Sequence, residues 1–174
     1  MDKVKNQRVF NVIWFFVMFS FITIASYAQD NNSKSKDEAF KKEAQKLATK
    51  LVDKLGLKSD KTDKISSILE DYRKDIADAH KDYLDKKQKN DEKMTGSSSR
   101  DKRESASEKK TEAYRDLKGE YKKADDKADK DITDQLDNKT EKDKYMQIKK
   151  GWWKDVKNKV YSSLSITRRE SNKY

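Results

Sequence analysis

The chain contains no cysteine and no proline, and it has only one histidine and four glycines among its 174 residues. The lack of cysteine excludes disulfides, thiol nucleophiles and cysteine-ligated metal sites. The single histidine, His80, excludes a histidine-pair zinc site, and we expect it to pack between helices rather than to bind a ligand. The scattered glycines form no phosphate-binding loop. We therefore predict that the protein is not an enzyme and that it needs neither a cofactor nor a metal.

Large apolar residues are scarce outside the first 28 residues. From Gln29 onward the chain has only 19 Leu, Ile, Val and Phe residues, whereas 43% of the whole sequence is charged. Such a chain cannot build a thick core, but it can build thin helices that share narrow apolar seams. The same scarcity leaves open a largely disordered exported polypeptide, because low apolar content is typical of disorder.

The first 28 residues have the layout of a secretory signal peptide. Lys3, Lys5 and Arg8 precede the apolar run VFNVIWFFVMFSFITIA, and small residues at Ser26 and Ala28 favour cleavage before Gln29. We therefore predict an exported, periplasmic protein that is cleaved after Ala28. An uncleaved membrane anchor remains the alternative, although the apolar run is shorter than the roughly 20 residues that span a bilayer.

The chain is basic, but its charges are mixed along the sequence. The part from Gln29 onward has 39 Lys and Arg residues against 31 Asp and Glu residues. Because the acidic residues are interleaved with the basic ones, attraction to nucleic-acid phosphates would be weak, and we predict no nucleic-acid partner. The many adjacent carboxylates are interpreted as solvated helix faces rather than as acid–base pairs.

Apolar residues recur at helical spacing in four segments, and strand alternation is absent from the sequence. We predict helices at about 36–55, from about 60 into the mid-90s, from about 101 to 136, and from Asn138 to about 164. Gly56 suits a helix C-cap, and the run 95–99 (TGSSS) is the clearest break. The prediction is an all-α fold of four helices with two long middle ones. They form one domain at 36–165, between a flexible tail at 29–35 and a frayed tail at 166–174.

The stretch LGLKSDKTDKISSIL resembles the LTxxQ motif region of the Spy/CpxP family of bacterial periplasmic proteins. Leu57 matches the leucine of the motif, and Ile65 matches the apolar position eight residues later. Lys58 and Lys61 stand where the motif has threonine and glutamine. A second and looser motif-like turn begins at Leu136, before the last helix.

The resemblance implies a thin, antiparallel helical cradle that forms a homodimer. It also implies ATP-independent chaperone activity, in which the protein holds unfolded or aggregation-prone envelope proteins. The family's zinc binding does not carry over to a chain with one histidine and no cysteine. An envelope stress regulator or structural adaptor that binds one specific partner is the alternative function.

The last helix carries the residues that we predict for client binding. It has paired tryptophans in a lysine-rich segment, and this combination suits the capture of acidic, partly apolar polypeptides. A seam between two copies of the chain is the alternative for the tryptophans, and contact with a membrane surface is possible but not favoured. The client-binding candidates are Trp152, Trp153, Tyr161, Lys149, Lys150, Lys154 and Lys157.

Overall fold

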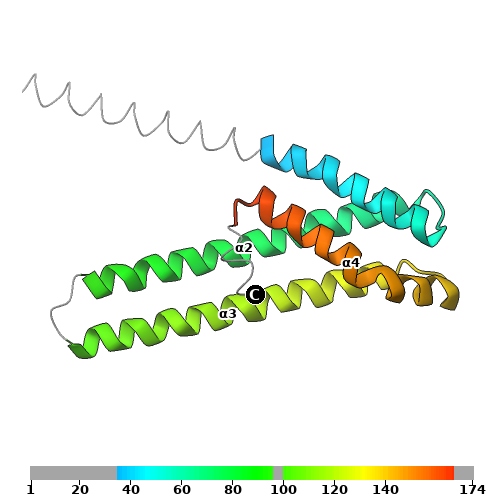
Figure 1. Ribbon diagram of the computed structural model, residues 1–174. Helices are drawn as coiled ribbons and strands as arrows, with labels where there is room; N and C mark the ends of the chain where they lie inside the picture. The colour runs from blue at the N-terminus through cyan, green and yellow to red at the C-terminus, as the bar shows by residue number, and fades with distance from the viewer. Residues whose placement is uncertain (1–34, 96–99, 167–174) are drawn as a thin grey trace, which may run out of the picture. The chain divides into compact units, whose positions relative to one another are not determined.

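The computed structural model describes residues 35–95 and 100–166, and within them it contains four α-helices and no strand (Figure 1). The predicted all-α fold with four helices is thereby confirmed. The predicted signal peptide, most of the tail at 29–35, the glycine and serines of the 95–99 break and all but the first residue of the C-terminal tail lie outside the described residues.

The helix boundaries lie close to the predicted ones. The first described helix spans residues 35–55, and it is followed by α2 (Lys61–Thr95), α3 (Arg100–Thr133) and α4 (Lys139–Ser163). The two middle helices are the long ones, with 35 and 34 residues. The third helix ends three residues before Leu136, because residues 134–136 turn toward α4. The chain divides into two compact units, residues 1–39 and 40–174, and the core described below lies in the second.

Helices α2 and α3 run antiparallel and side by side (Figure 1). Large apolar residues are buried along the half of the pair where α2 begins and α3 finishes, from Ile65 and Ile132 as far as Ile76 and Leu117. Toward the other end the seam narrows to Ala106 and Ala113, with Tyr83 packed edge-on to Tyr114 at 6.4 Å. This half of the pair therefore depends on small side chains and on ion pairs such as Lys110–Asp91 at 2.8 Å.

The core is completed by α4 and by the helix of residues 40–55, which pack against each other and against the α2–α3 pair. Trp152 donates its indole Nε1–H to the Leu47 carbonyl at 3.1 Å, and Arg73 of α2 donates to Ser163 Oγ of α4 at 2.9 Å. Arg73 also lies over the ring of Phe40, 5.3 Å from its centroid. The largest side chains that are less than 2% exposed are Tyr72, Tyr145, Leu51, Leu55, Ile65, Leu69, Ile76, Ile132, Val156 and Val160.

Two helices end in the same backbone motif, although only one of them uses glycine. Gly56 has φ +69°, Leu57 N–H donates to Val52 O at 3.0 Å, and Gly56 N–H donates to Asp53 O at 3.3 Å. Ser165 has φ 58°, and the N–H of the following Ile166 donates to Tyr161 O at 2.9 Å. Both ends satisfy terminal carbonyls by a Schellman motif and direct an apolar side chain back onto the core.

A reciprocal pair of side chains caps the start of α4. Asn138 Oδ1 accepts a hydrogen bond from Glu141 N–H at 2.9 Å, and Glu141 Oε2 accepts from Asp137 N–H at 2.7 Å. These bonds satisfy donors that the first turn of a helix leaves without partners. They therefore fix where the lysine-rich helix begins.

Candidate functional site

A groove of about 630 Å³ runs between α3 and α4, and it gathers most of the residues predicted from the sequence. Six of the seven client-binding candidates line it, and Trp152 does not. The groove lies along the inner rows of α4 and along a short acidic segment of α3. Its lining residues are Asp125, Asp126, Asp129, Met146, Lys149, Lys150, Trp153, Lys154, Lys157, Asn158 and Tyr161.

The two tryptophans lie inside the fold of a single chain. Trp152 is 4% exposed and Trp153 is 8% exposed, and their rings meet edge-to-face at 5.2 Å. Trp152 is turned toward the helix of residues 40–55, where its indole bonds Leu47 O. The indoles therefore serve the core of one chain, and this arrangement leaves little of either ring for direct contact with a client or a second copy.

Asp129 is the centre of a hydrogen-bond cluster that fixes α4 on α3. Its Oδ1 accepts from Tyr145 Oη–H at 2.7 Å and from Trp153 Nε1–H at 3.2 Å, while Oδ2 accepts from Lys149 Nζ at 2.5 Å. Burial alone would raise the pKa of Asp129, but the hydrogen bonds from Lys149, Tyr145 and Trp153 together hold that pKa below its usual value. The carboxylate is therefore charged and fully engaged at neutral pH.

Asp125, one helical turn earlier on α3, repeats the same arrangement. Its Oδ1 accepts from Tyr72 Oη–H at 2.7 Å, and its Oδ2 accepts from Lys157 Nζ at 2.5 Å. Burial, with the charge of Asp125 nearby, raises the pKa of Tyr72 well above its usual value and that of Tyr161 to about 12. Both hydroxyls stay protonated at physiological pH, and that of Tyr72 acts as a donor to Asp125.

The outer rim of the groove carries charged side chains that form no ion pair within the described residues. Lys150 and Lys154 are exposed one turn apart on α4, and neither forms an ion pair within the described residues. Met146, one further turn toward the N-terminus, is 65% exposed, and Tyr161 is half-buried. Asp126 is the exposed carboxylate on the opposite side. The groove thus offers two free ammonium groups next to exposed apolar surface, which suits binding rather than chemistry.

Sequence reasoning missed the acidic side of this groove. Asp125 and Asp129 stand four residues apart in the run YKKADDKADKD, which was interpreted as a solvated face with alternating charge. Their placement next to Ala124 and Ala128, both buried, is the signal that could have marked them as facing a neighbour. Alternating charge alone does not distinguish a carboxylate that bonds another helix from one that faces water.

The two motif-like turns meet in the structure. Leu57 is half-buried against the core, Ile65 and Leu136 are buried, and Lys58 is exposed. Lys61 reaches from the first turn to the second, where its Nζ donates to Gln135 O and Asp137 Oδ1, both at 2.9 Å. Lys61 therefore joins the start of α2 to the segment before α4.

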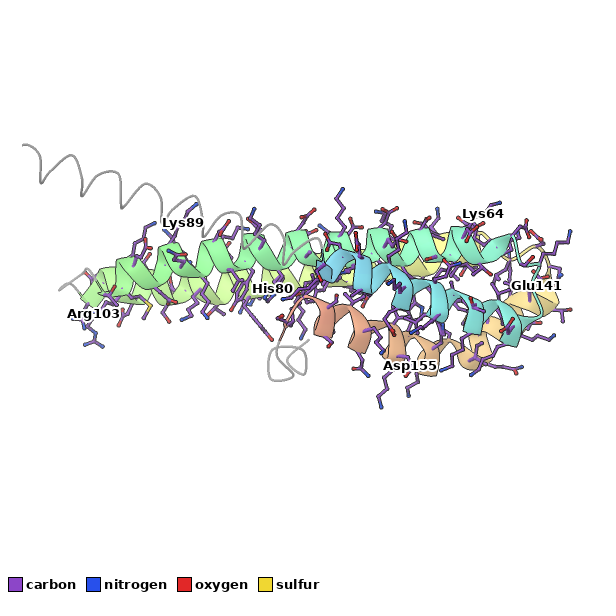
Figure 2. The ribbon with its side chains drawn as sticks, turned by 90° about the horizontal axis from the view of Figure 1, so that it is seen from above. Lys64, His80, Lys89, Arg103, Glu141 and Asp155 are labelled. Atoms are coloured by element: carbon purple, nitrogen blue, oxygen red, sulfur yellow. The ribbon has the colours of Figure 1, made fainter. Side chains whose placement is uncertain are left out.

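His80 lies on α2 where that helix faces α3 (Figure 2). Its Nδ1 is 3.0 Å from the Tyr121 hydroxyl, and its ring is 6.3 Å from that of Tyr83. Tyr121 in turn stacks on Tyr161 at 6.0 Å. The histidine is thus part of the aromatic packing between the helices. Across residues 35–95 and 100–166, the structure holds no group of three or more potential metal ligands.

None of the described helices is both long and apolar enough to cross a bilayer. Comparison of the chain with models of known protein families, with curated proteins and with solved structures finds no match.

Proposed function

We propose that the protein is an exported, ATP-independent holdase that binds unfolded polypeptides at the groove between α3 and α4. The observation that carries this proposal is the rim of the groove. There the free ammonium groups of Lys150 and Lys154 adjoin the exposed side chain of Met146 and the half-buried ring of Tyr161. Flexible lysines attract acidic segments at long range, and apolar edges then hold many sequences loosely.

The charge distribution on α4 supports the same proposal. The helix Lys139–Ser163 has eight lysines and only three carboxylates. Two of the lysines in the groove, Lys149 and Lys157, are paired with Asp129 and Asp125 and hold the helix in place. The other two lysines of the groove, Lys150 and Lys154, form no ion pair within the described residues. A binding surface of this kind needs no nucleotide, which agrees with an exported protein.

The proposal is tested by aggregation of a chemically unfolded model protein diluted into buffer without ATP. The protein is used as recovered from an exporting host, and its mass shows whether residues 1–28 have been removed. Suppression of light scattering at near-equimolar ratio, weakened by salt, is the expected result. The double variant Lys150→Gln/Lys154→Gln should lose most of the suppression.

The matched control is Lys142→Gln/Lys144→Gln, because both lysines are exposed on the same helix and neither lines the groove. This control changes the net charge by the same amount and should suppress aggregation as the wild type does. A helical protein that suppresses no aggregation would contradict the holdase and would favour the single-partner adaptor instead. Equal loss in both double variants would show that net charge acts without the groove.

A further inference from the structure

Among the four helices that the structure describes, the basic surplus lies mainly in two. The segment 40–55 and α4 together have 13 lysines against five carboxylates. The α2–α3 pair has 20 lysines and arginines against 19 carboxylates, so it is almost neutral. The helices that carry the surplus contact each other through Lys50–Asp155 at 3.2 Å and Lys159–Glu43 at 2.9 Å. Their combined outer surface is therefore the basic side of this part of the molecule.

The segment 40–55 has a row of four lysines on its outer face. Lys42, Lys46, Lys50 and Lys54 follow one another at intervals of four residues, and all four are exposed. Residues four apart on a helix have Cβ atoms about 6 Å apart, so the ammonium groups form a line along the helix. Together with Gln45, Thr49 and Asp53 they enclose a shallow depression of about 580 Å³. We call these four residues the lysine row.

The lysine row is available to a partner, because its internal ion pairs are weak. Lys42 and Lys54 form no ion pair within the described part of the chain. Lys46 pairs with Glu43 and Lys50 pairs with Asp155, but the two lysine side chains remain 73% and 50% exposed. Ion pairs that are this exposed contribute little, so both lysines can exchange their carboxylates for other anions.

The composition of this face indicates a partner that presents many phosphates in a plane. No aromatic residue stands among the residues that line the depression, so stacking on nucleic-acid bases is not available. The apolar residues of the segment, such as Ala44, Leu47 and Leu51, point into the core and cannot insert into lipid. A line of flexible ammonium groups without apolar neighbours suits binding on top of an anionic bilayer surface.

The position of the lysine row in the sequence agrees with a bilayer partner. Lys42 follows the apolar run at 9–25 by only 17 residues. A basic segment this close to an apolar one is brought to a membrane surface while the chain is exported, and it stays there if the apolar run is retained. We propose that the lysine row docks the protein on a bilayer surface that contains anionic phospholipids. This inference does not depend on the groove or on its clients.

The test is flotation of the protein with lipid vesicles. The protein as recovered from an exporting host is mixed with zwitterionic vesicles, or with vesicles that contain one third anionic phospholipid, at low and at high salt. The apolar contribution of residues 1–28 enters both lipid mixtures, and their charges are the same in the wild type and in the variants. The change in the ratio of the two partition coefficients between variant and wild type therefore isolates the charge of the lysine row. For the wild type we expect the partition coefficient with anionic vesicles to be well above that with zwitterionic vesicles. The ratio of the first to the second should fall by at least about tenfold in the variant Lys42→Gln/Lys46→Gln/Lys50→Gln/Lys54→Gln. High salt should produce a similar fall.

The matched control is Lys64→Gln/Lys74→Gln/Lys81→Gln/Lys89→Gln, which removes four exposed lysines from α2. This control should keep the wild-type ratio, and circular dichroism checks that both variants keep their helices. If the fourfold variant loses helix, Lys42→Gln/Lys54→Gln replaces it, because this pair breaks no internal ion pair. A wild-type ratio of one, or an equal fall in the control, overturns the proposal. Binding of a short DNA duplex through the lysine row without vesicle binding would assign the face to a nucleic acid and would overturn it as well.

Discussion

Lys61 and Asp137, 76 positions apart in the chain, form an ion pair with an Nζ–Oδ1 distance of 2.9 Å. The same ammonium group donates to the Gln135 carbonyl, and only 12% of the Lys61 side chain is exposed. The pair joins the first residue of α2 to the turn before α4. It therefore fixes the two places where the chain reverses at this end of the molecule.

Removal of this link should destabilise the protein. We expect Lys61→Met to lower the free energy of unfolding by about 1–2 kcal/mol, because the Gln135 carbonyl loses a charged donor. Urea denaturation followed by circular dichroism measures the change. Lys58→Met is the control, since Lys58 is exposed, and it should change stability by less than about 0.5 kcal/mol. Equal effects of the two substitutions would contradict the link.

The same pair should contribute to the pH dependence of stability. The hydrogen bond from Lys61 holds the pKa of Asp137 below its usual value. A carboxyl with a lowered folded-state pKa stabilises the protein above its unfolded-state pKa, and the contribution is lost as the pH falls through the folded-state value. The difference in stability between wild type and Lys61→Met should therefore shrink between pH 5 and pH 2. A difference that stays constant would contradict a role of the Asp137 charge.

Asp129 should control how firmly α4 is held. Asp129→Asn keeps the shape of the side chain but removes the charge that Lys149 binds, so we expect a loss of about 1–3 kcal/mol at pH 7. Because the pKa of Asp129 is lowered in the folded state, the wild type should lose this extra stability as the pH falls. The free energies of unfolding of the wild type and of Asp129→Asn should therefore converge below pH 3. Asp126→Asn, on the exposed neighbour, should leave the curve at pH 7 within about 0.5 kcal/mol. Similar losses in both variants would show that Asp129 has no special role.

Replacement of glycine by alanine should destabilise the protein at Gly56 and stabilise it at Gly119. At Gly56 a β-carbon meets no neighbour within 4 Å, but φ is +69°, so Gly56→Ala should cost about 1 kcal/mol through backbone strain alone. Gly119 lies within α3 and also has open space around it, so Gly119→Ala should stabilise by about 0.5–1 kcal/mol. Thermal unfolding of the two variants side by side checks both signs, and destabilisation by Gly119→Ala would be contrary to this account.

Ser66 offers a stabilising substitution in the core. Its side chain is buried within α2, and Ser66 Oγ is the only fully buried side-chain oxygen or nitrogen in the described residues without a hydrogen-bond partner. The buried hydroxyl of Ser66 has lost its hydrogen bonds to water and gains none in the protein, which destabilises the fold. Ser66→Ala removes this hydroxyl, so we expect the free energy of unfolding to rise by about 1 kcal/mol. Ser67→Ala, on the exposed neighbour, should have little effect. A loss of stability in Ser66→Ala would mean that the hydroxyl finds a partner in solution.

Substitution of the two tryptophans tests whether their side chains serve folding or client binding. Because Trp152 and Trp153 are both buried, we expect Trp152→Ala to lower stability by about 3–5 kcal/mol. Trp153→Phe keeps an aromatic ring but loses part of the indole volume and the bonds to Asp129 and Tyr145, so it should cost less than Trp152→Ala and leave aggregation suppression in place. If a folded Trp153→Phe protein loses suppression, the indole itself touches the client and the burial argument fails.

The sequence by itself determined the class of the fold and the positions of its helices. Periodic apolar residues, Gly56 and the pair Asn138–Glu141 act within one or two helical turns, so their consequences can be derived from neighbouring residues. The lysine-rich character of the last helix is likewise a property of the local sequence. The sequence therefore indicated α4 as the helix that carries most of the groove residues.

Only the tertiary structure decided which side of α4 faces inward. Trp152 and Trp153 are adjacent in a helix, and no local rule distinguishes a tryptophan that binds a client from one that fills a core. The choice depends on Leu47, Tyr72 and Asp129, which come from three other helices and meet the indoles only after the chain has folded. The link from Lys61 to Asp137 is likewise invisible in the sequence, because ion pairs between distant residues depend on how the helices pack.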